Sequence, residues 1–154
     1  MKLNKKTKSR LQELAGVKKE LPTMKSMLPK YKLRYSESDT FIIVNIEKLL
    51  KQHVLDNPSY AFNNREGADH PGRIEAAKQF WLDYCNDDRF IDFKTGDRNE
   101  YSKVYFEAPL VSIDYGKLGF SDGRHRVIAM KEIGYKNIII EIPKEQIELF
   151  KNII

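Results

Sequence analysis

The sequence predicts a small α+β domain in which helices pack on a small mixed sheet. Short β-branched and aromatic runs, typical of buried strands, alternate with segments whose apolar residues recur at helical spacing. The clearest strands are Phe41–Ile46, Leu110–Ile113 and Ile138–Ile142, and the clearest helices are Pro71–Tyr84 and Arg124–Ile133. A chain of 154 residues is long enough for one domain with its own apolar core.

A basic segment precedes the predicted domain. Residues 1–35 hold 11 of the 27 Lys and Arg residues but only 2 of the 22 Asp and Glu residues. We therefore divide the chain into a basic N-terminal arm, 1–36, and a domain, 37–154. Such a charge favours nucleic acid, first of all DNA, as a partner, although a solvated tail that only aids solubility explains it equally well. The arm residues assigned to nucleic acid are Lys5, Lys6, Lys8, Arg10, Lys30, Lys32 and Arg34.

The composition limits the classes of protein to consider. Cys85 is the single cysteine, so an internal disulfide and a cysteine-based zinc site are excluded. A reducing, cytoplasmic location is therefore expected. The apolar runs are strand-sized and fall short of the roughly 18 residues of a membrane span, so no membrane partner is expected.

The first half of the chain contains three kinds of segment. Residues 3–20 place apolar side chains among lysines, which predicts a short amphipathic helix. Two prolines bracket Thr23–Leu28, which is interpreted as a connector. After the first strand, Glu47–Val54 is predicted to be a helix that ends near His53, a favourable place for a cation. Residues 55–70 are rich in Asn, Asp, Pro and Gly and predict a long loop of the kind that is often functional.

The second half is richer in strands. Pro71 suits the first turn of its helix, on which Trp81 and its aromatic neighbours are more typical of a core than of a base-stacking platform. After a polar connector at 86–99, strands are expected on both sides of Pro109, at Val104–Phe106 and Leu110–Ile113. The remaining elements are a turn at Tyr115–Gly116 leading to a strand that ends at Phe120, a helix stop at Gly134 and a final helix at Lys144–Asn152.

The run Phe120–Arg126 carries the main functional signal. It reads Phe-Ser-Asp-Gly-Arg-His-Arg and leads directly into the Arg124–Ile133 helix. Helix N-termini attract anions through unpaired N–H groups and a partial positive charge, and adjacent guanidinium groups strengthen that attraction. The residues assigned to phosphate binding are Gly123, Arg124, His125 and Arg126.

Further roles follow from the same run. Asp122 is expected to cap the helix, and Gly123 to let a ligand approach the backbone. Asp122 and His125 are the candidate catalytic residues, because an aspartate beside phosphate holds Mg²⁺ and a histidine moves a proton. The alternative is purely structural: Asp122 only caps the helix, and the basic residues form surface ion pairs. His70 and Arg73, just before and within the Pro71 helix, are candidates to line the same cleft, or only begin that helix.

The segment from Pro109 to Ile142, with its Asp-Gly-Arg-His-Arg core, resembles the ParB/sulfiredoxin superfamily. The resemblance implies a nucleotide, here a nucleoside triphosphate with Mg²⁺, bound at the helix N-terminus. Sulfiredoxins carry a cysteine where this chain has Arg124, so sulfinic-acid repair is not expected. ParB-type CTPases are similar at Gly123, Arg124 and Arg126, but this chain lacks room for their DNA-binding and dimerisation modules.

Two other branches are also similar to this chain. Free-serine kinases carry Asp-Gly-x-His-Arg, which the present motif matches, and need a glutamate base, for which Glu47 and Glu66 are candidates. Stand-alone phage or plasmid proteins with this core are often described as nucleases, which would require an acidic pair such as Asp114 with Asp122.

Three functions remain open from the sequence. The first is a phage-type, DNA-associated protein that binds nucleotide or nucleic-acid phosphates, with or without nuclease activity. The second is an ATP-dependent phosphotransferase, and the third is a non-catalytic interaction protein with a vestigial pocket. Tyr31 and Tyr35, which alternate with basic residues, either stack on bases or belong to a tether.

Overall fold

The computed structural model describes residues 21–33, 37–61, 70–86 and 106–154, and its architecture is α+β, as the sequence predicts. Its strands form one sheet in the order β1-β4-β2-β3. They are β1 (Asp39–Asn45), β2 (Leu110–Asp114), β3 (Lys117–Asp122) and β4 (Asn137–Pro143). β4 is antiparallel to β1 and parallel to β2, and β2 forms an antiparallel hairpin with β3, so the sheet is mixed.

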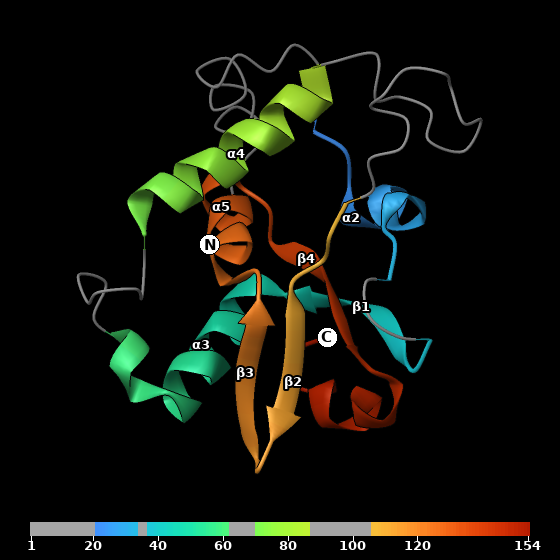
Figure 1. Cartoon of the computed structure of the whole chain (residues 1–154), viewed down its shortest axis with the longest axis vertical. Coiled ribbons are helices and arrows are strands. Elements are labelled where there is room, and N and C mark those ends of the chain that lie inside the picture. The colour runs from blue at the N-terminus through green and yellow to red at the C-terminus, as the bar shows by residue number, and fades with distance from the viewer. Residues whose placement is uncertain (1–20, 34–36, 62–69, 87–105) are drawn as a thin grey trace.

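Three longer helices pack around this sheet: α3 (Ile46–Asp56), α4 (Pro71–Asn86) and α5 (Arg124–Ile133). In Figure 1, α4 crosses the top of the view above α5, and the β2–β3 hairpin points its turn to the bottom. Asn45 caps α3, because its side chain accepts a hydrogen bond from the N–H of Lys48 at 2.9 Å. Within the described ranges, no helix combines the length and the apolarity that crossing a membrane requires.

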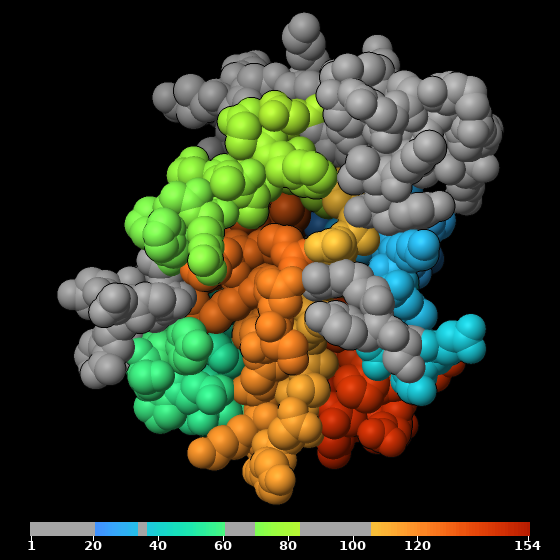
Figure 2. All heavy atoms as spheres, viewed as in Figure 1, coloured from blue at the N-terminus to red at the C-terminus, as the bar shows by residue number. Residues whose placement is uncertain are grey.

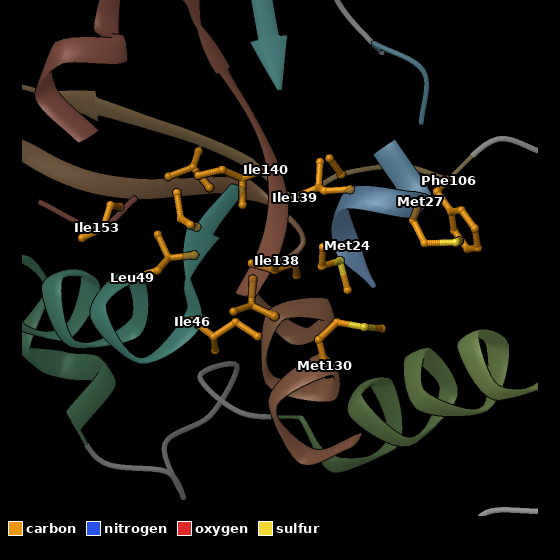
Figure 3. Packing of buried hydrophobic residues seen from close by; sticks show 14 of the residues in the cluster. Met24, Met27, Ile46, Leu49, Phe106, Met130, Ile138, Ile139, Ile140 and Ile153 are labelled. Atoms are coloured by element: carbon orange, nitrogen blue, oxygen red, sulfur yellow. The ribbon is translucent and has the colours of Figure 1, made fainter. Parts of the chain in front are cut away.

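The core lies where β4 meets the helices. The side chains of Ile139, Ile140 and Ile142 are fully buried, as the isoleucine run predicts. Figure 3 shows Ile46 and Leu49 of α3 packing near this strand, with Met130 of α5 close by. Hydrophobic burial on this scale fixes the position of α5, and with it the position of the Asp-Gly-Arg-His-Arg turn.

The described part of the arm, residues 21–33, packs into the same core. It contains a short helix, α2 (Met24–Met27), and a 3₁₀ segment, η1 (Leu28–Lys30), so the interpretation of Thr23–Leu28 as a connector is wrong. The side chains of Met24 and Met27 are 4% and 2% exposed. Tyr135 Oη donates a hydrogen bond to Pro22 O at 2.6 Å. Residues 21–33 therefore dock on the domain, and deleting the whole arm would open its core.

Several segments differ from the prediction. The expected loop at 55–70 begins with the last turn of α3 and a 3₁₀ segment, η2 (Pro58–Ala61), and its residues 62–69 lie outside the described residues. The final helix predicted at Lys144–Asn152 is present as η5 (Lys144–Phe150), which is of the 3₁₀ type. Of the strand expected at Val104–Phe106, only Phe106 is described, and it forms an isolated parallel bridge with Tyr31. The predicted helix at 3–20 lies outside the described residues, as does the predicted connector 86–99 apart from Asn86, which is the last residue of α4.

Candidate functional site

Gly123 is the N-cap of α5, where the sequence predicted Asp122, which instead is the last residue of β3. The glycine has φ +92°, in the left-handed region that other residues avoid. A Cβ at this position would lie 2.6 Å from Pro109 Cα. The glycine is therefore required because the backbone of Pro109 approaches it. Pro109 fills the space of the missing side chain, and the approach of a ligand to the backbone of Gly123 stays a prediction.

Arg126 holds this turn in place. Its Nη2 donates to Asp122 Oδ2 at 2.8 Å, and its Nη1 donates to the carbonyl oxygen of Glu107. The pair joins the end of β3 to the segment that leads into β2. The Arg126 side chain is 28% exposed, so this charge-assisted contact is partly shielded from water. Asp122 and Arg126 thus stabilise the turn from which α5 begins.

The residues proposed for a metal ion do not fit that role. One oxygen of Asp122 already accepts from Arg126, and Asp114 lies at the opposite end of the hairpin, where it pairs with Lys117. Leu110 is the partner of Asp122, and the four residue steps from Leu110 to Asp114 span about 13 Å at the rise of a strand. The two carboxylates therefore cannot share one ion. Among the described residues there is also no group of three or more His, Cys, Asp or Glu side chains placed to hold a metal.

The glutamate base expected for a kinase is not near the motif either. Glu47 lies in the first turn of α3, next to Ile46, whose N–H donates to Lys136 O at 2.8 Å. Lys136 follows the C-terminal end of α5, so Glu47 lies at the end of that helix away from Arg124. Glu66, the other candidate, lies outside the described residues.

His125 contacts the start of the neighbouring helix. The backbone N–H of His70 donates to His125 Nε2 at 3.1 Å. His70 in turn caps α4, because its Nδ1 accepts from the N–H of Arg73 at 3.3 Å. The sequence predicted that His70 and Arg73 lie beside the motif, and the structure places the backbone of His70 directly against it. The side chain of Arg73 is exposed on the first turn of α4.

The two helices therefore begin side by side and run in the same direction. Further along them, the rings of Trp81 and Tyr135 are 5.6 Å apart, and Lys78 Nζ lies 4.0 Å from Glu132 Oε2. Each helix N-terminus carries a partial charge of about +0.5, and two such ends placed together reinforce each other. This end of the molecule attracts anions more strongly than a single helix would.

Arg124 contacts a cluster that the sequence did not reveal. Its guanidinium carbon lies 4.6 Å from the centre of the Tyr60 ring, a cation–π contact. The same ring lies 4.6 Å from the imidazole of His53, which also packs edge-on against Phe120 at 4.8 Å. Tyr60 was missed because it falls in the segment expected to be a loop. The only signal for it was an aromatic residue in a polar stretch.

His53 is not the helix-end cation that the sequence predicted. Its side chain is 3% exposed, and its Nδ1 has no hydrogen-bond partner among the described residues. Burial and, to a smaller extent, the positive charge of Arg124 lower the pKa of His53 to about 4, although the negative charge of Asp56 opposes both. The imidazole is therefore neutral at pH 7, and Arg124 supplies the positive charge of this cluster.

The arm residues are only partly described. Lys30 and Lys32 flank Tyr31: Phe106 N–H donates to Lys30 O at 3.2 Å and Phe106 O accepts from Lys32 N–H at 3.5 Å. Five other assigned residues lie outside the described residues, so their role stays a prediction: Lys5, Lys6, Lys8, Arg10 and Arg34.

Comparison of the chain with protein-family models, curated proteins and solved structures found no match.

Proposed function

We propose that this protein binds the phosphate groups of a nucleotide or of DNA at the shared start of α4 and α5. The observation that supports this most directly is the hydrogen bond from His70 N–H to His125 Nε2, which holds two helix N-termini together. Parallel helix ends of like sign repel each other, and an anion bound beside both of them lowers that repulsion. Phosphate carries the required charge and several acceptor oxygens.

The proposal assigns different roles to the motif residues. Arg124 provides the cation of the site, with its plane oriented by the Tyr60 ring. Asp122 and Arg126 are positioning residues, because their contacts with each other and with Glu107 fix the turn. Nε2 of His125 accepts the hydrogen bond from His70 N–H and thereby orients α4. Because this nitrogen would otherwise be the one to accept a proton, we assign His125 to binding and not to catalysis. A nucleoside triphosphate would bind here without a metal ligand from Asp122.

Replacing Arg124 by glutamine tests the phosphate site. Charge-assisted hydrogen bonds contribute about 1.5–3 kcal/mol, so the affinity for tripolyphosphate should fall about 10- to 150-fold. The matched control is Lys131→Gln, which removes a cation from the last turn of the same helix and should leave the affinity unchanged. Isothermal titration calorimetry measures both, with circular dichroism to verify that each variant is folded. Equal losses in the two variants, or no binding by the parent protein, would contradict the proposal.

Duplex DNA, titrated at a series of salt concentrations, tests the second ligand. If DNA phosphates bind, the logarithm of the association constant should fall linearly with the logarithm of salt, by about 0.9 for each phosphate neutralised. Changing Lys5, Lys6, Lys8 and Arg10 together to glutamine should then reduce this slope by up to about 3–4. Substitution is preferable to deleting the arm, because Met24 and Met27 belong to the core. An unchanged slope would assign the arm no part in DNA binding.

A further inference from the structure

An open cavity lies beside the proposed phosphate site, between α4, α5 and the bridge that joins Tyr31 to Phe106. Its volume is about 360 Å³, within the range of roughly 300–1,000 Å³ typical of small-molecule sites. Aromatic side chains dominate its wall: Tyr31, Phe80, Trp81 and Phe106. In Figure 2, this region is where the green atoms of α4 approach the yellow atoms that lead into β2.

The aromatic wall is held in place by hydrogen bonds outside the cavity. Phe106 lies centrally, with its ring 4.9 Å from that of Trp81 and 5.3 Å from that of Tyr31. Trp81 Nε1 donates to Tyr135 Oη at 3.2 Å, which fixes the indole. The backbone of Phe106 is fixed in turn by its bridge to the arm. Such a preformed wall binds a planar ring at little cost in side-chain entropy.

Phe80 differs from the other three rings because its side chain is 50% exposed. The sequence predicted a core role for both Phe80 and Trp81, and the structure bears this out for Trp81 alone, which is 2% exposed. The ring of Phe80 stands edge-on to Phe106 at 6.1 Å and forms part of the cavity wall. A large aromatic side chain kept in water next to a cavity is available to stack on a ligand.

The polar groups of the cavity match the edge of a heteroaromatic ring. Two charged residues, Glu107, which is exposed, and Arg126, line the cavity. A carboxylate accepts a hydrogen bond from an exocyclic amine, such as that of cytosine or adenine. Burial raises the pKa of Tyr31, against the opposing charge of Arg126, so its hydroxyl group keeps its proton.

We propose that this cavity binds the nucleobase of a nucleotide, with an amino-bearing base such as cytosine or adenine favoured by Glu107. The inference rests on the proposed function, because it places the phosphates of the same molecule at the start of α4 and α5. Arg126 connects the two places: it lines the cavity and lies in the first turn of α5, adjacent to His125. Ala77, which lines the cavity, follows His70 by seven residues, or about 10 Å at a helical rise of about 1.5 Å per residue, and an extended nucleoside triphosphate is long enough to span this distance.

Trp81 gives a direct readout of this cavity, because it is the single tryptophan of the chain. The full-length protein is titrated with adenosine, with cytidine and with tripolyphosphate while Trp81 fluorescence is followed; calorimetry measures tripolyphosphate binding in parallel. A base that stacks in the cavity should quench the fluorescence without any phosphate. Tripolyphosphate should bind and leave the fluorescence unchanged.

Two variants separate the base from the phosphates. Phe80→Ala removes a wall of the cavity, and Ala77→Leu fills part of its volume. Either should weaken ATP or CTP binding about 5- to 150-fold, the range for loss of base stacking, and leave tripolyphosphate binding unchanged. Leu55→Ala on α3, which shortens a side chain that is 63% exposed, is the control and should alter neither.

The outcomes distinguish the two proposals. Tripolyphosphate binding without nucleoside quenching, and with no effect of Phe80→Ala or Ala77→Leu on ATP and CTP, would overturn the base site and leave the phosphate site intact. Quenching by nucleosides with no tripolyphosphate binding would overturn the phosphate site and support the cavity as a site for the ring. Quenching by N-acetyltyrosine amide but by neither nucleoside would overturn the base site in favour of an aromatic side chain of a protein partner.

Discussion

Replacing Gly123 by alanine is expected to lower the free energy of unfolding by about 2–5 kcal/mol. A left-handed backbone costs a residue with a Cβ about 1–2 kcal/mol, and forcing an extra carbon into a packed site typically costs about 1–3 kcal/mol more. Both penalties apply here, because φ is +92° and the new Cβ would lie 2.6 Å from Pro109 Cα. Backbone atoms on both sides leave this contact little freedom to relax. Urea denaturation followed by circular dichroism measures the loss.

Two other glycines provide matched controls for this variant. Gly116 has a positive φ of +75° but nothing within 4 Å of an added Cβ, so Gly116→Ala isolates the backbone penalty of about 1–2 kcal/mol. Gly119 has neither a positive φ nor a close neighbour, so Gly119→Ala should change stability by less than about 1 kcal/mol. If Gly123→Ala lost no more free energy of unfolding than Gly116→Ala, the close approach of Pro109 would not explain why a glycine is needed at position 123. Ligand approach to the backbone would then be the better explanation for this glycine.

Local pattern predicted the elements that form the sheet and α5. The strand in the Ile138–Ile142 run and the helix from Arg124 to Gly134 were predicted because β-branched runs and helix stops are local signals. The N-cap was assigned wrongly for the same reason. Asp is a common cap, and nothing in the local sequence shows that the backbone of Pro109 packs against the next residue. That contact joins residues 14 positions apart and exists only after folding.

Long-range packing also accounts for the other errors. Met24 and Met27 are flanked by prolines and lysines, which is typical of a connector, yet both are buried against the domain. Asp114 and Asp122 flank one turn in sequence, but the hairpin register places them at opposite ends of its strands. His70 and His125 are brought together from positions 55 residues apart. The motif could therefore be recognised in the sequence, whereas the partners of each motif residue depend on contacts that no local pattern encodes.

The buried His53 should make the protein sensitive to acid, and removing the imidazole should abolish most of that sensitivity. Its pKa is about 4 in the folded chain and about 6.5 when exposed, so the unfolded state binds more protons between these values. Stability from this group is therefore fully present above pH 6.5 and is lost as the pH falls towards 4. A difference of about 2.5 pKa units amounts to about 3 kcal/mol over this range.

His53→Phe is the sharpest test of this linkage. Phenylalanine can pack between Tyr60 and Phe120 as the imidazole does, and the buried Nδ1 without a partner among the described residues disappears. We expect the variant to be at least as stable as the parent protein at pH 7, because an unsatisfied buried polar atom is removed. At pH 4 it should be more stable than the parent by about 3 kcal/mol.

The comparison must separate His53 from nearby carboxylates, because those also titrate in this range. Asp56 accepts from Leu118 N–H at 2.8 Å, which lowers the pKa of its carboxyl and adds its own acid sensitivity to both proteins. Only the difference between parent and variant therefore reports on His53. Tyr60→Phe, which keeps the imidazole and its aromatic neighbour, should retain the parent's pH dependence. Parallel loss of stability in parent and His53→Phe between pH 6.5 and 4 would show that the imidazole is not held neutral by burial beside Arg124.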